Sequence, residues 1–381
     1  MTTVDLGDLG LDEGGHLLVA RALAREAEVR VVGSAPTLAV DLPAWCRALG
    51  HACADSVVTR GPHDRRRGAE RAGKIESPSE HASQHWGLAA RGALVEAGVP
   101  ALDFAFADKY ELWSDDAARL YAQAAAAQWD PETAIPWDAP VTHPDEVEDA
   151  VVQVMTYLIE NETAALLVPT RFLSRLHPHF REVMQLLAIQ AADEARHIEV
   201  FTRRARLRRK ELGLSTAGGQ ASLATLFQEH DFAIASFLLS VLGEGSFLSL
   251  LAFIRDHAPD ACTRAVARLA GQDEARHVAF GLAHVGEHLR TDPSLRERLA
   301  AAVERRHAAL ANTAGLNAEV FDALVLLAAG SWEPQAIRKG HAAVVALVAD
   351  MDAGRRQRLQ RLGFESANAA ALSSLHTRNF M

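Results

Sequence analysis

The sequence predicts a mainly α-helical protein, a four-helix bundle with extra helices that is preceded by a small α/β domain. Its 381 residues are 49% hydrophobic but only 6% aromatic, and the richness in Ala, Leu and Arg favours helix. The first 62 residues alternate between strand and helix patterns. Further along, the pentapeptide DEARH occurs twice within long stretches of helical periodicity.

The composition excludes several classes of function. With 39 basic and 49 acidic residues, the chain has a net charge of −10, so a nucleic-acid partner is not expected. Two basic runs, 63–71 and 203–210, are interpreted as solvated faces or linkers. The three cysteines, Cys46, Cys53 and Cys262, lack the number and spacing of a disulfide framework. Because the N-terminus lacks a signal-peptide pattern, a cytoplasmic location is expected.

Residues 1–62 are predicted to form the α/β domain. Apolar residues alternate at the start, and a helical pattern at 16–27, a short strand at 29–32 and a second helix at 41–49 follow. Residues 63–84 are rich in charge, Gly, Ser and Pro and have no apolar periodicity. That composition is typical of a linker.

The helical domain is predicted over residues 85–381. Nearly all of its prolines fall where helices are expected to begin or end. The bundle that carries the motifs spans about 145–291, and residues 292–381 form a C-terminal extension of amphipathic helices. These last helices are expected to cover the bundle and to shape either a substrate cavity or the interface of a homodimer.

One apolar stretch could form either a membrane-spanning helix or a helix of the protein core. Residues 236–254 form 19 positions with a single charge, Glu244, near the middle. A carboxylate at the centre of a membrane span is costly, and no other segment is a comparable candidate. We therefore predict a buried core helix and no membrane insertion.

The two DEARH copies, at 193–197 and 273–277, carry the chemistry. On a helix, Glu194 and His197 lie three residues apart on one face, and so do Glu274 and His277. Each copy therefore offers one carboxylate and one imidazole to a shared point. This is the Glu-x-x-His half-site of a carboxylate-bridged dimetal bundle.

Such a site needs one more glutamate from each of two further helices. Glu162 precedes Glu194 by 32 residues, and Glu244 precedes Glu274 by 30. Separations near 30 suit ligands at the midpoints of antiparallel helices joined by short turns. An isolated carboxylate in so apolar a helix as that of Glu244 must also protonate or find a cation.

Glu160 is the alternative ligand to Glu162. Glu162 shares a helix face with the apolar Met155, whereas Glu160 shares its face with Gln153 and Thr156. Glu162 is therefore preferred, and Glu160 is kept open.

The rest of each motif has a predicted supporting role. A metal-bound imidazole needs its second ring nitrogen tied to an acceptor, and each aspartate can reach the histidine of the opposite helix. The arginines then offset the excess negative charge. The expected contacts are Asp193 with His277, Asp273 with His197, and Arg196 and Arg276 with those aspartates.

The ligand set also indicates the metal. Four carboxylates carry four negative charges, which two divalent cations balance, and oxygen-rich donors suit iron or manganese. Two iron ions are predicted, with a manganese–iron pair as the alternative. His284 lies seven residues beyond His277 on the same face and is interpreted as a supporting or cavity polar group. The predicted apolar lining of the site is Leu158, Leu166, Phe237, Phe247 and Leu248.

These residues resemble the ferritin-like diiron-carboxylate superfamily, in the branch where D-E-x-R-H marks both Glu-x-x-His helices. The resemblance covers about residues 110–291. It implies a non-haem diiron oxidase or oxygenase, in which the dimetal centre itself uses dioxygen for two-electron hydroxylation, desaturation or N-oxidation of a small organic substrate. Ala270 stands where some branches of the superfamily have a His. Leu248 stands where other branches have a Thr or Ser.

Partners and alternatives follow from the same resemblance. No Gly-rich nucleotide loop or Cys cluster is present, so electrons are expected from an external reductase or ferredoxin. One alternative is a ferroxidase or peroxide-scavenging protein, which would need no lipophilic cavity. The other is a metal-stabilised interaction protein.

The N-terminal domain resembles the small sulfur-carrier (TusA-type) family through SAPTLAVDLPAWCRALGH, residues 34–51. The family's Cys-Pro dipeptide is missing, because the region after the first strand reads GLDEGGHLLVARAL. The resemblance therefore implies a degenerate adaptor, docking or dimerisation module, in which Cys46 has a packing role.

Overall fold

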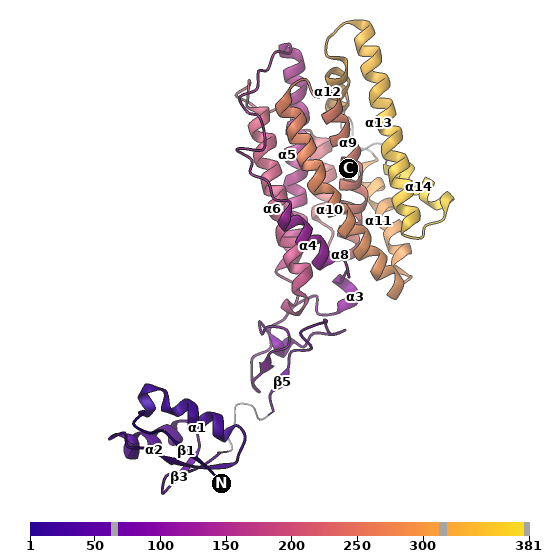
Figure 1. Cartoon of the computed structure of the whole chain (residues 1–381). Coiled ribbons are helices and arrows are strands. Elements are labelled where there is room, and N and C mark those ends of the chain that lie inside the picture. The colour runs from indigo at the N-terminus through magenta and orange to yellow at the C-terminus, as the bar shows by residue number, and fades with distance from the viewer. Residues whose placement is uncertain (62–67, 312–317, 377–381) are drawn as a thin grey trace. The chain divides into compact units, whose positions relative to one another are not determined.

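The computed structural model describes residues 1–61, 68–311 and 318–376, which divide into two compact units. The first unit comprises residues 1–77 and 85–102, and the second comprises 78–84 and the chain from 103 onward. Helices dominate the second unit, and the sheet lies in the first (Figure 1). The predicted fold class, mainly α behind a small α/β unit, is confirmed.

The first unit is built on a four-stranded sheet in the order β1-β2-β4-β3. The strands are β1 (Thr2–Asp5), β2 (Glu28–Val32), β3 (Ala52–Ala54) and β4 (Val57–Thr59). β1 and β2 are parallel, and the other two pairings are antiparallel. Asp55 and Ser56 both have positive φ, 48° and 60°, as a two-residue hairpin turn between β3 and β4 requires.

Two helices bury one face of this sheet. They are α1 (His16–Leu23), which follows a π-helical turn at Leu11–Gly15, and α2 (Leu38–Ala48). Val19 of α1, Cys46 of α2 and alternate strand residues such as Val29 and Val31 form a common core. The first helix ends four residues earlier than the predicted 16–27, and the second begins three residues before the predicted 41–49.

The boundary between the two units does not fall where the sequence predicts it, with a linker at 63–84 and a helical domain that starts at residue 85. β5 (Glu70–Arg71) falls inside the predicted linker and pairs with β6 (Leu94–Val95). Backbone pairing, which a composition pattern does not show, therefore joins residues 85–102 to the first unit. Residues 62–67 of that linker lie outside the described residues.

Four long helical segments form the bundle of the second unit (Figure 1). They are α5 (Asp145–Leu173), α6 (Arg181–Ala205), α10 (Ala261–Thr291), and a composite of α8 (Phe232–Ser236), the π-helical η4 (Phe237–Glu244) and α9 (Gly245–Asp256). Short connections join α5 to α6 and α9 to α10. The predicted four-helix bundle is the arrangement found.

Local signals explain where these helices begin. Pro144 immediately precedes α5, whose first turn carries Asp145, Glu146 and Glu148. Asp260 caps α10 by accepting a hydrogen bond from the Thr263 backbone N–H at 2.8 Å. Each start therefore follows from chemistry that the sequence displays.

The remaining helices flank the bundle. They are α3 (Lys109–Leu112), α4 (Ala117–Ala126), α7 (Ala217–Phe227), α11 (Leu295–Leu310), α12 (Ala318–Ala329), α13 (Pro334–Arg361) and α14 (Ser366–His376), with short 3-10 turns at Gln84–Trp86 and Pro178–Phe180. α13 packs against α12, α9 and α14. Of the predicted C-terminal extension, residues 312–317 and 377–381 lie outside the described residues.

The structure confirms one prediction made from the sequence and corrects another. Within the described residues, one helical stretch, Phe232–Asp256, is long and apolar enough to cross a membrane, and 78% of its most apolar window is buried in the protein. The predicted core helix is therefore found. The interpretation of 203–210 as a solvated face or linker is wrong at Arg204, which is fully buried because acidic groups of two other helices surround it.

Candidate metal centre

The six predicted ligands come from all four segments of the bundle and lie together in its core. α5 supplies Glu162, α6 supplies the first Glu-x-x-His pair, the end of η4 supplies Glu244, and α10 supplies the second pair. Their side chains form two overlapping groups in which the ligand atoms all lie within 4.8 Å of one another. The groups are Glu162, Glu194, His197 and Glu274, and Glu194, Glu244, Glu274 and His277.

Glu194 and Glu274 belong to both groups, so they occupy the positions of bridging carboxylates. The Nδ1 of His197 lies 3.1 Å from Glu194 and 3.4 Å from Glu274. The Nδ1 of His277 lies 3.0 Å from Glu194 and 3.4 Å from Glu274. Both imidazoles therefore turn the same ring nitrogen toward the shared carboxylates.

Burial separates the two candidates on α5. Glu162 is 2% exposed and its carboxylate lies 3.7 Å from the Nδ1 of His197. Glu160 is only half-buried and is not a member of either group. The structure thus brings Glu162, and not Glu160, to the cluster.

The outer nitrogens of the two imidazoles contact the motif aspartates. The Nε2 of His197 lies 3.1 Å from Asp273, and that of His277 lies 3.3 Å from Asp193. Each contact crosses from one motif helix to the other. These aspartates hold the rings with Nδ1 directed inward, as a metal-binding imidazole requires.

Arginines of the same motifs neutralise the aspartates. Arg196 donates to Asp193 at 2.5 Å and to Asp273 at 2.9 Å. Arg276 donates to Asp273 and lies 3.7 Å from Asp193. Hydrogen bonds from His277 and His197 help to hold the pKa of Asp193 and Asp273 below the usual range, against the upward effect of burial.

Two residues of the segment that leads into the bundle complete this network. Trp129 is predicted from the sequence only to pack the end of the bundle, and no pattern in the sequence indicates Gln128. The Nε1 of Trp129 donates to Asp273 at 2.8 Å, and the Arg196 guanidinium lies 4.5 Å from its ring centroid. Gln128 donates to Asp193 at 2.8 Å and accepts from Arg196 at 2.5 Å. Helical periodicity in the sequence could not predict these contacts, because the segment 127–144 is not helical.

Electrostatics inside the cluster favour a bound cation. Burial raises the pKa of Glu162 and Glu244 well above the usual range, and the neighbouring carboxylates raise it further. Burial also raises the pKa of Glu194, but the charge of His277 and the hydrogen bond from His197 outweigh it and leave that pKa lowered. The two imidazoles therefore do not supply enough positive charge to balance the four carboxylates enclosed with them.

Unpaired oxygens show that the residues fit a metal. Buried atoms without a hydrogen-bond partner include Oε1 of Glu162, Oε1 of Glu194, Oε2 of Glu244, both carboxylate oxygens of Glu274 and Nδ1 of His277. Buried polar atoms are normally paired, so this many in one place is unusual. Metal ions at the two groups would satisfy them, and an O-rich set with one nitrogen per group suits iron or manganese.

The metal-free protein is expected to lose stability as pH rises from about 5 to about 9, a range set by ordinary carboxyl and imidazole titration. The raised pKa of His197 and His277 gives stability that is present below the unfolded imidazole pKa and lost as pH rises through the folded value. The raised pKa of Glu162 and Glu244 acts in the same direction, because deprotonation leaves a buried charge.

Urea unfolding of chelator-treated protein across this range measures the effect. Saturating divalent metal should flatten or reverse the trend, because metal replaces the protons. A metal-free protein that becomes more stable with rising pH would contradict the assignment of these shifts.

The π-helical turn in η4 places Glu244 at the cluster. Residues Phe237–Glu244 form this segment, which is entirely buried. A π-helical turn adds a residue to the helical repeat and shifts the face that later side chains present. Sequence periodicity at 3.6 residues per turn does not reveal such a shift.

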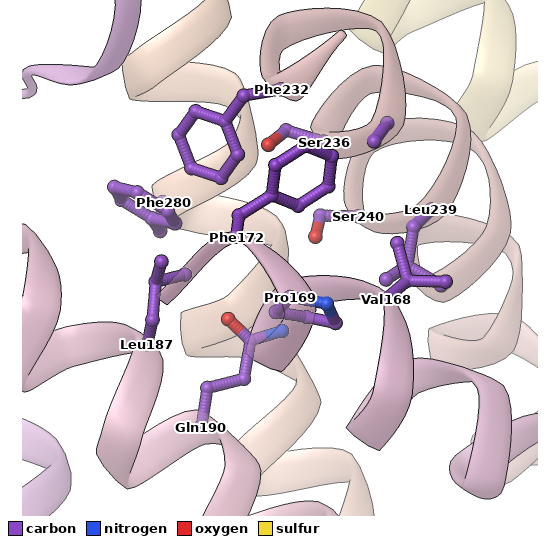
Figure 2. A pocket seen from close by; sticks show the side chains of 11 residues that line it. Val168, Pro169, Phe172, Leu187, Gln190, Phe232, Ser236, Leu239, Ser240 and Phe280 are labelled. Carbon is purple, nitrogen blue, oxygen red and sulfur yellow. The ribbon is translucent and has the colours of Figure 1, made fainter. Parts of the chain in front are cut away.

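A small pocket with a cavity volume of about 10 Å³ lies beside the cluster, and Figure 2 shows the side chains that line it. Gln190 connects the two, because it lines the pocket and its Nε2 lies 3.4 Å from Glu244. Most of the wall is apolar, formed by Val168, Pro169, Phe172, Leu187, Phe232, Ala235, Leu239 and Phe280, with Ser236 and Ser240 as polar members. None of the five residues of the predicted apolar lining lines this pocket, whose walls come from residues 168–172 of α5 and from α6, α8, η4 and α10.

His284 lies near this pocket's aromatic wall. Its ring centroid is 4.8 Å from that of Phe232 and 5.8 Å from that of Phe280. Its Nδ1 lies 3.3 Å from the Trp113 carbonyl oxygen, and burial lowers the pKa of His284 to about 4. It is therefore a neutral buried group beside the pocket.

No protein-family model and no curated protein matches the sequence. Among solved structures, a variant of an R2-like ligand-binding oxidase with an aerobically reconstituted Mn/Fe cofactor is 17% identical, with a TM-score of 0.48 over 67% of this chain and 94% of that chain. A variant with an anaerobically reconstituted Mn/Fe cofactor is 16% identical, with a TM-score of 0.47 over 70% and 95%.

Proposed function

We propose that this chain is a dimetal oxidase or oxygenase that uses dioxygen for the two-electron oxidation of an organic substrate by hydroxylation, desaturation or N-oxidation. The observation that carries the proposal is the six-residue cluster of unpaired carboxylates and imidazoles with an apolar pocket against it. A diiron centre is proposed, with manganese–iron as the alternative. When bound, such a centre supplies the binding and reduction of dioxygen.

The chain's own residues prepare the site for this chemistry. Glu194 and Glu274, which belong to both ligand groups, would be shared by the two ions, and Glu162 and Glu244 would each hold one ion. Asp193 and Asp273 keep the imidazoles oriented. Burial of the whole set excludes water, which strengthens its electrostatics and protects reactive species.

The pocket favours this function over a ferroxidase or peroxide scavenger. Iron and peroxide are small and polar, so an apolar pocket beside the centre serves neither of them. An organic substrate, in contrast, gains from burying apolar surface against Phe172, Phe232 and Phe280. Gln190, between pocket and cluster, offers an amide to orient a polar atom of that substrate.

The first experiment is metal analysis by plasma emission, together with a stopped-flow optical trace when the anaerobically reduced protein meets oxygen. We expect about two irons per chain, as the two ligand groups require, and a transient visible band. Less than about half a metal per chain after reconstitution would overturn the proposal, because the fully assembled site binds two.

Filling the pocket is expected to separate substrate binding from metal binding. Ala235→Leu adds bulk to the pocket wall, where Ala235 is buried. We expect organic ligands to bind at least about tenfold more weakly, with metal content unchanged and about 1–3 kcal/mol of stability lost to overpacking. Ala195→Leu on the exposed face of α6 is the matched control. Equal ligand affinity in both variants would place the substrate elsewhere.

The proposed reaction needs a source of electrons. We propose an external reductase or ferredoxin as electron donor, because the sequence has no Gly-rich nucleotide loop or Cys cluster of its own. Oxidation of substrate in the presence of dioxygen and a chemical reductant, but not without the reductant, tests this requirement.

We propose that the N-terminal unit is an adaptor with a TusA-like arrangement, without sulfur-carrier activity. Cys46 is buried in the core of this unit, and burial together with Cys53 raises the pKa of its thiol to about 12. We therefore expect Cys46 to resist alkylation in the native protein and to react after unfolding. Mass spectrometry after iodoacetamide treatment measures this, and rapid native labelling of Cys46 would contradict a packing role.

A further inference from the structure

Two arginines on α13, of which Arg355 is buried and Arg358 is partly buried, pack against the segment that carries Glu244. Arg355 and Arg358 lie one turn apart, and Arg355 is only 1% exposed. The Nε of Arg358 donates to the Val241 carbonyl oxygen of η4 at 2.7 Å. Arg355 donates from Nη1 to the Ser246 hydroxyl of α9 at 3.2 Å and from Nε to the Ser373 hydroxyl of α14 at 3.3 Å.

All of these acceptors are neutral. Ser246 and Ser373 donate their own hydroxyl protons elsewhere, to the Leu242 carbonyl and to Asp352. Asp352 is also engaged by Arg356 at 2.6 Å. Within the described residues, no carboxylate pairs with either Arg355 or Arg358.

Each guanidinium also keeps a free donor group. The Nη2 atoms of Arg355 and Arg358 are buried and have no hydrogen-bond partner. Burial lowers the pKa of both side chains to about 10. The nearby charge of Asp352 raises the pKa of Arg355 in part, and the charge of Arg355 lowers the pKa of Arg358 further. Buried charges are normally paired, as Arg204 is with Glu148 and Asp260.

The backbone leaves room for one of these guanidiniums. A Cβ on Gly245 would lie 2.4 Å from the Nε of Arg358, and one on Gly354 would lie 3.1 Å from its Nη1. Side chains at these positions would have to displace the arginine. The glycines therefore allow Arg358 to lie flat between α13 and the start of α9.

We propose that Arg355 and Arg358 form a binding site for an oxyanion, either a carboxylate or a phosphate group. Such a group supplies the missing negative charge and accepts from the two unpaired Nη2 atoms, and the guanidinium fork matches its planar or tetrahedral oxygens. This site is distinct from the metal cluster and does not depend on the proposed oxidase function.

Binding is tested on the full-length protein with inorganic phosphate and with acetate, at constant ionic strength set by chloride. Equilibrium dialysis with labelled phosphate should show saturable binding of about one per chain, and the thermal midpoint should rise with the ion that binds. Phosphate binding without acetate binding assigns a phosphate site, and the reverse assigns a carboxylate site. No saturable binding of either ion would overturn the proposal.

Variants assign the binding to this pair. Arg358→Met should weaken oxyanion binding at least about tenfold, and Arg358→Lys should weaken it less, because the charge is kept but the fork is lost. Arg356→Met is the matched control, since Arg356 is exposed and pairs with Asp352. Unchanged affinity in Arg358→Met would overturn the assignment. Should that variant not fold, Arg355→Lys is compared with Arg356→Met in the same assay.

Discussion

Glu274→Ala is expected to remove both metal ions at once. Glu274 belongs to both ligand groups, and both of its oxygens are buried without a hydrogen-bond partner. We expect the metal content to fall from about two per chain to less than about 0.3, since each ion loses a shared ligand. Plasma emission on protein reconstituted with iron, with thermal unfolding in parallel, measures the loss.

Variants of the two glutamates that each belong to only one ligand group give a more specific test. Glu162→Ala and Glu244→Ala each affect one group, so each should retain about one metal per chain. Glu160→Ala is the control, because Glu160 is half-buried and outside both groups. If Glu160→Ala loses metal while Glu162→Ala keeps it, the choice between these two glutamates is reversed.

Arg204→Ala is expected to cause the largest loss of stability among single changes outside the metal cluster. Arg204 is fully buried and donates to Glu148 at 2.9 Å through two nitrogens, to Asp260 at 2.7 Å and to Thr263 at 2.7 Å. Its removal leaves two buried carboxylates with His143, 2.7 Å from Glu148, as their remaining basic neighbour, which costs about 3–5 kcal/mol. Urea unfolding of metal-free protein measures the difference.

The pH dependence of that difference identifies its cause. Hydrogen bonds from Arg204 help to hold the pKa of Asp260 below its usual range, despite burial. Such a lowered pKa gives stability that is present above the unfolded carboxyl pKa and lost as pH falls through the folded value. The deficit of Arg204→Ala should therefore shrink below about pH 4, where carboxyl groups protonate.

Arg209→Ala is the control for Arg204→Ala. Arg209 lies shortly after the end of the same helix, and its ion pairs with Asp145 and Asp149 are largely exposed. Its loss should cost less than about 1 kcal/mol and depend on salt. Equal losses in both variants would show that burial does not set the strength of these pairs.

Much of the candidate site could be predicted because helical geometry fixes local neighbours. A spacing of three residues places Glu194 and His197 on one face in any α-helix, whatever the helix packs against. The doubled motif and the distances of 32 and 30 residues to Glu162 and Glu244 then limit how four helices can meet. Metal ligation by these residues stays a prediction that the geometry supports.

Other features depended on contacts between distant segments. Trp129 and Gln128 reach the motif aspartates from an irregular segment, and the pocket beside the cluster is lined by other residues than the predicted apolar lining. Arg204 was interpreted as solvated because it lies in a basic run. None of these has a signal within its own stretch of sequence.

The sequence by itself determined the mainly helical class, the two-motif bundle and the six residues that its spacing brings together. Only the tertiary structure decided which polar side chains are buried with partners, as Arg204 is, and which keep buried atoms without them, as Arg355 and Arg358 do. The physical reason is that periodicity sets the direction of a side chain relative to its own helix axis. What that side chain meets depends on how separate helices pack.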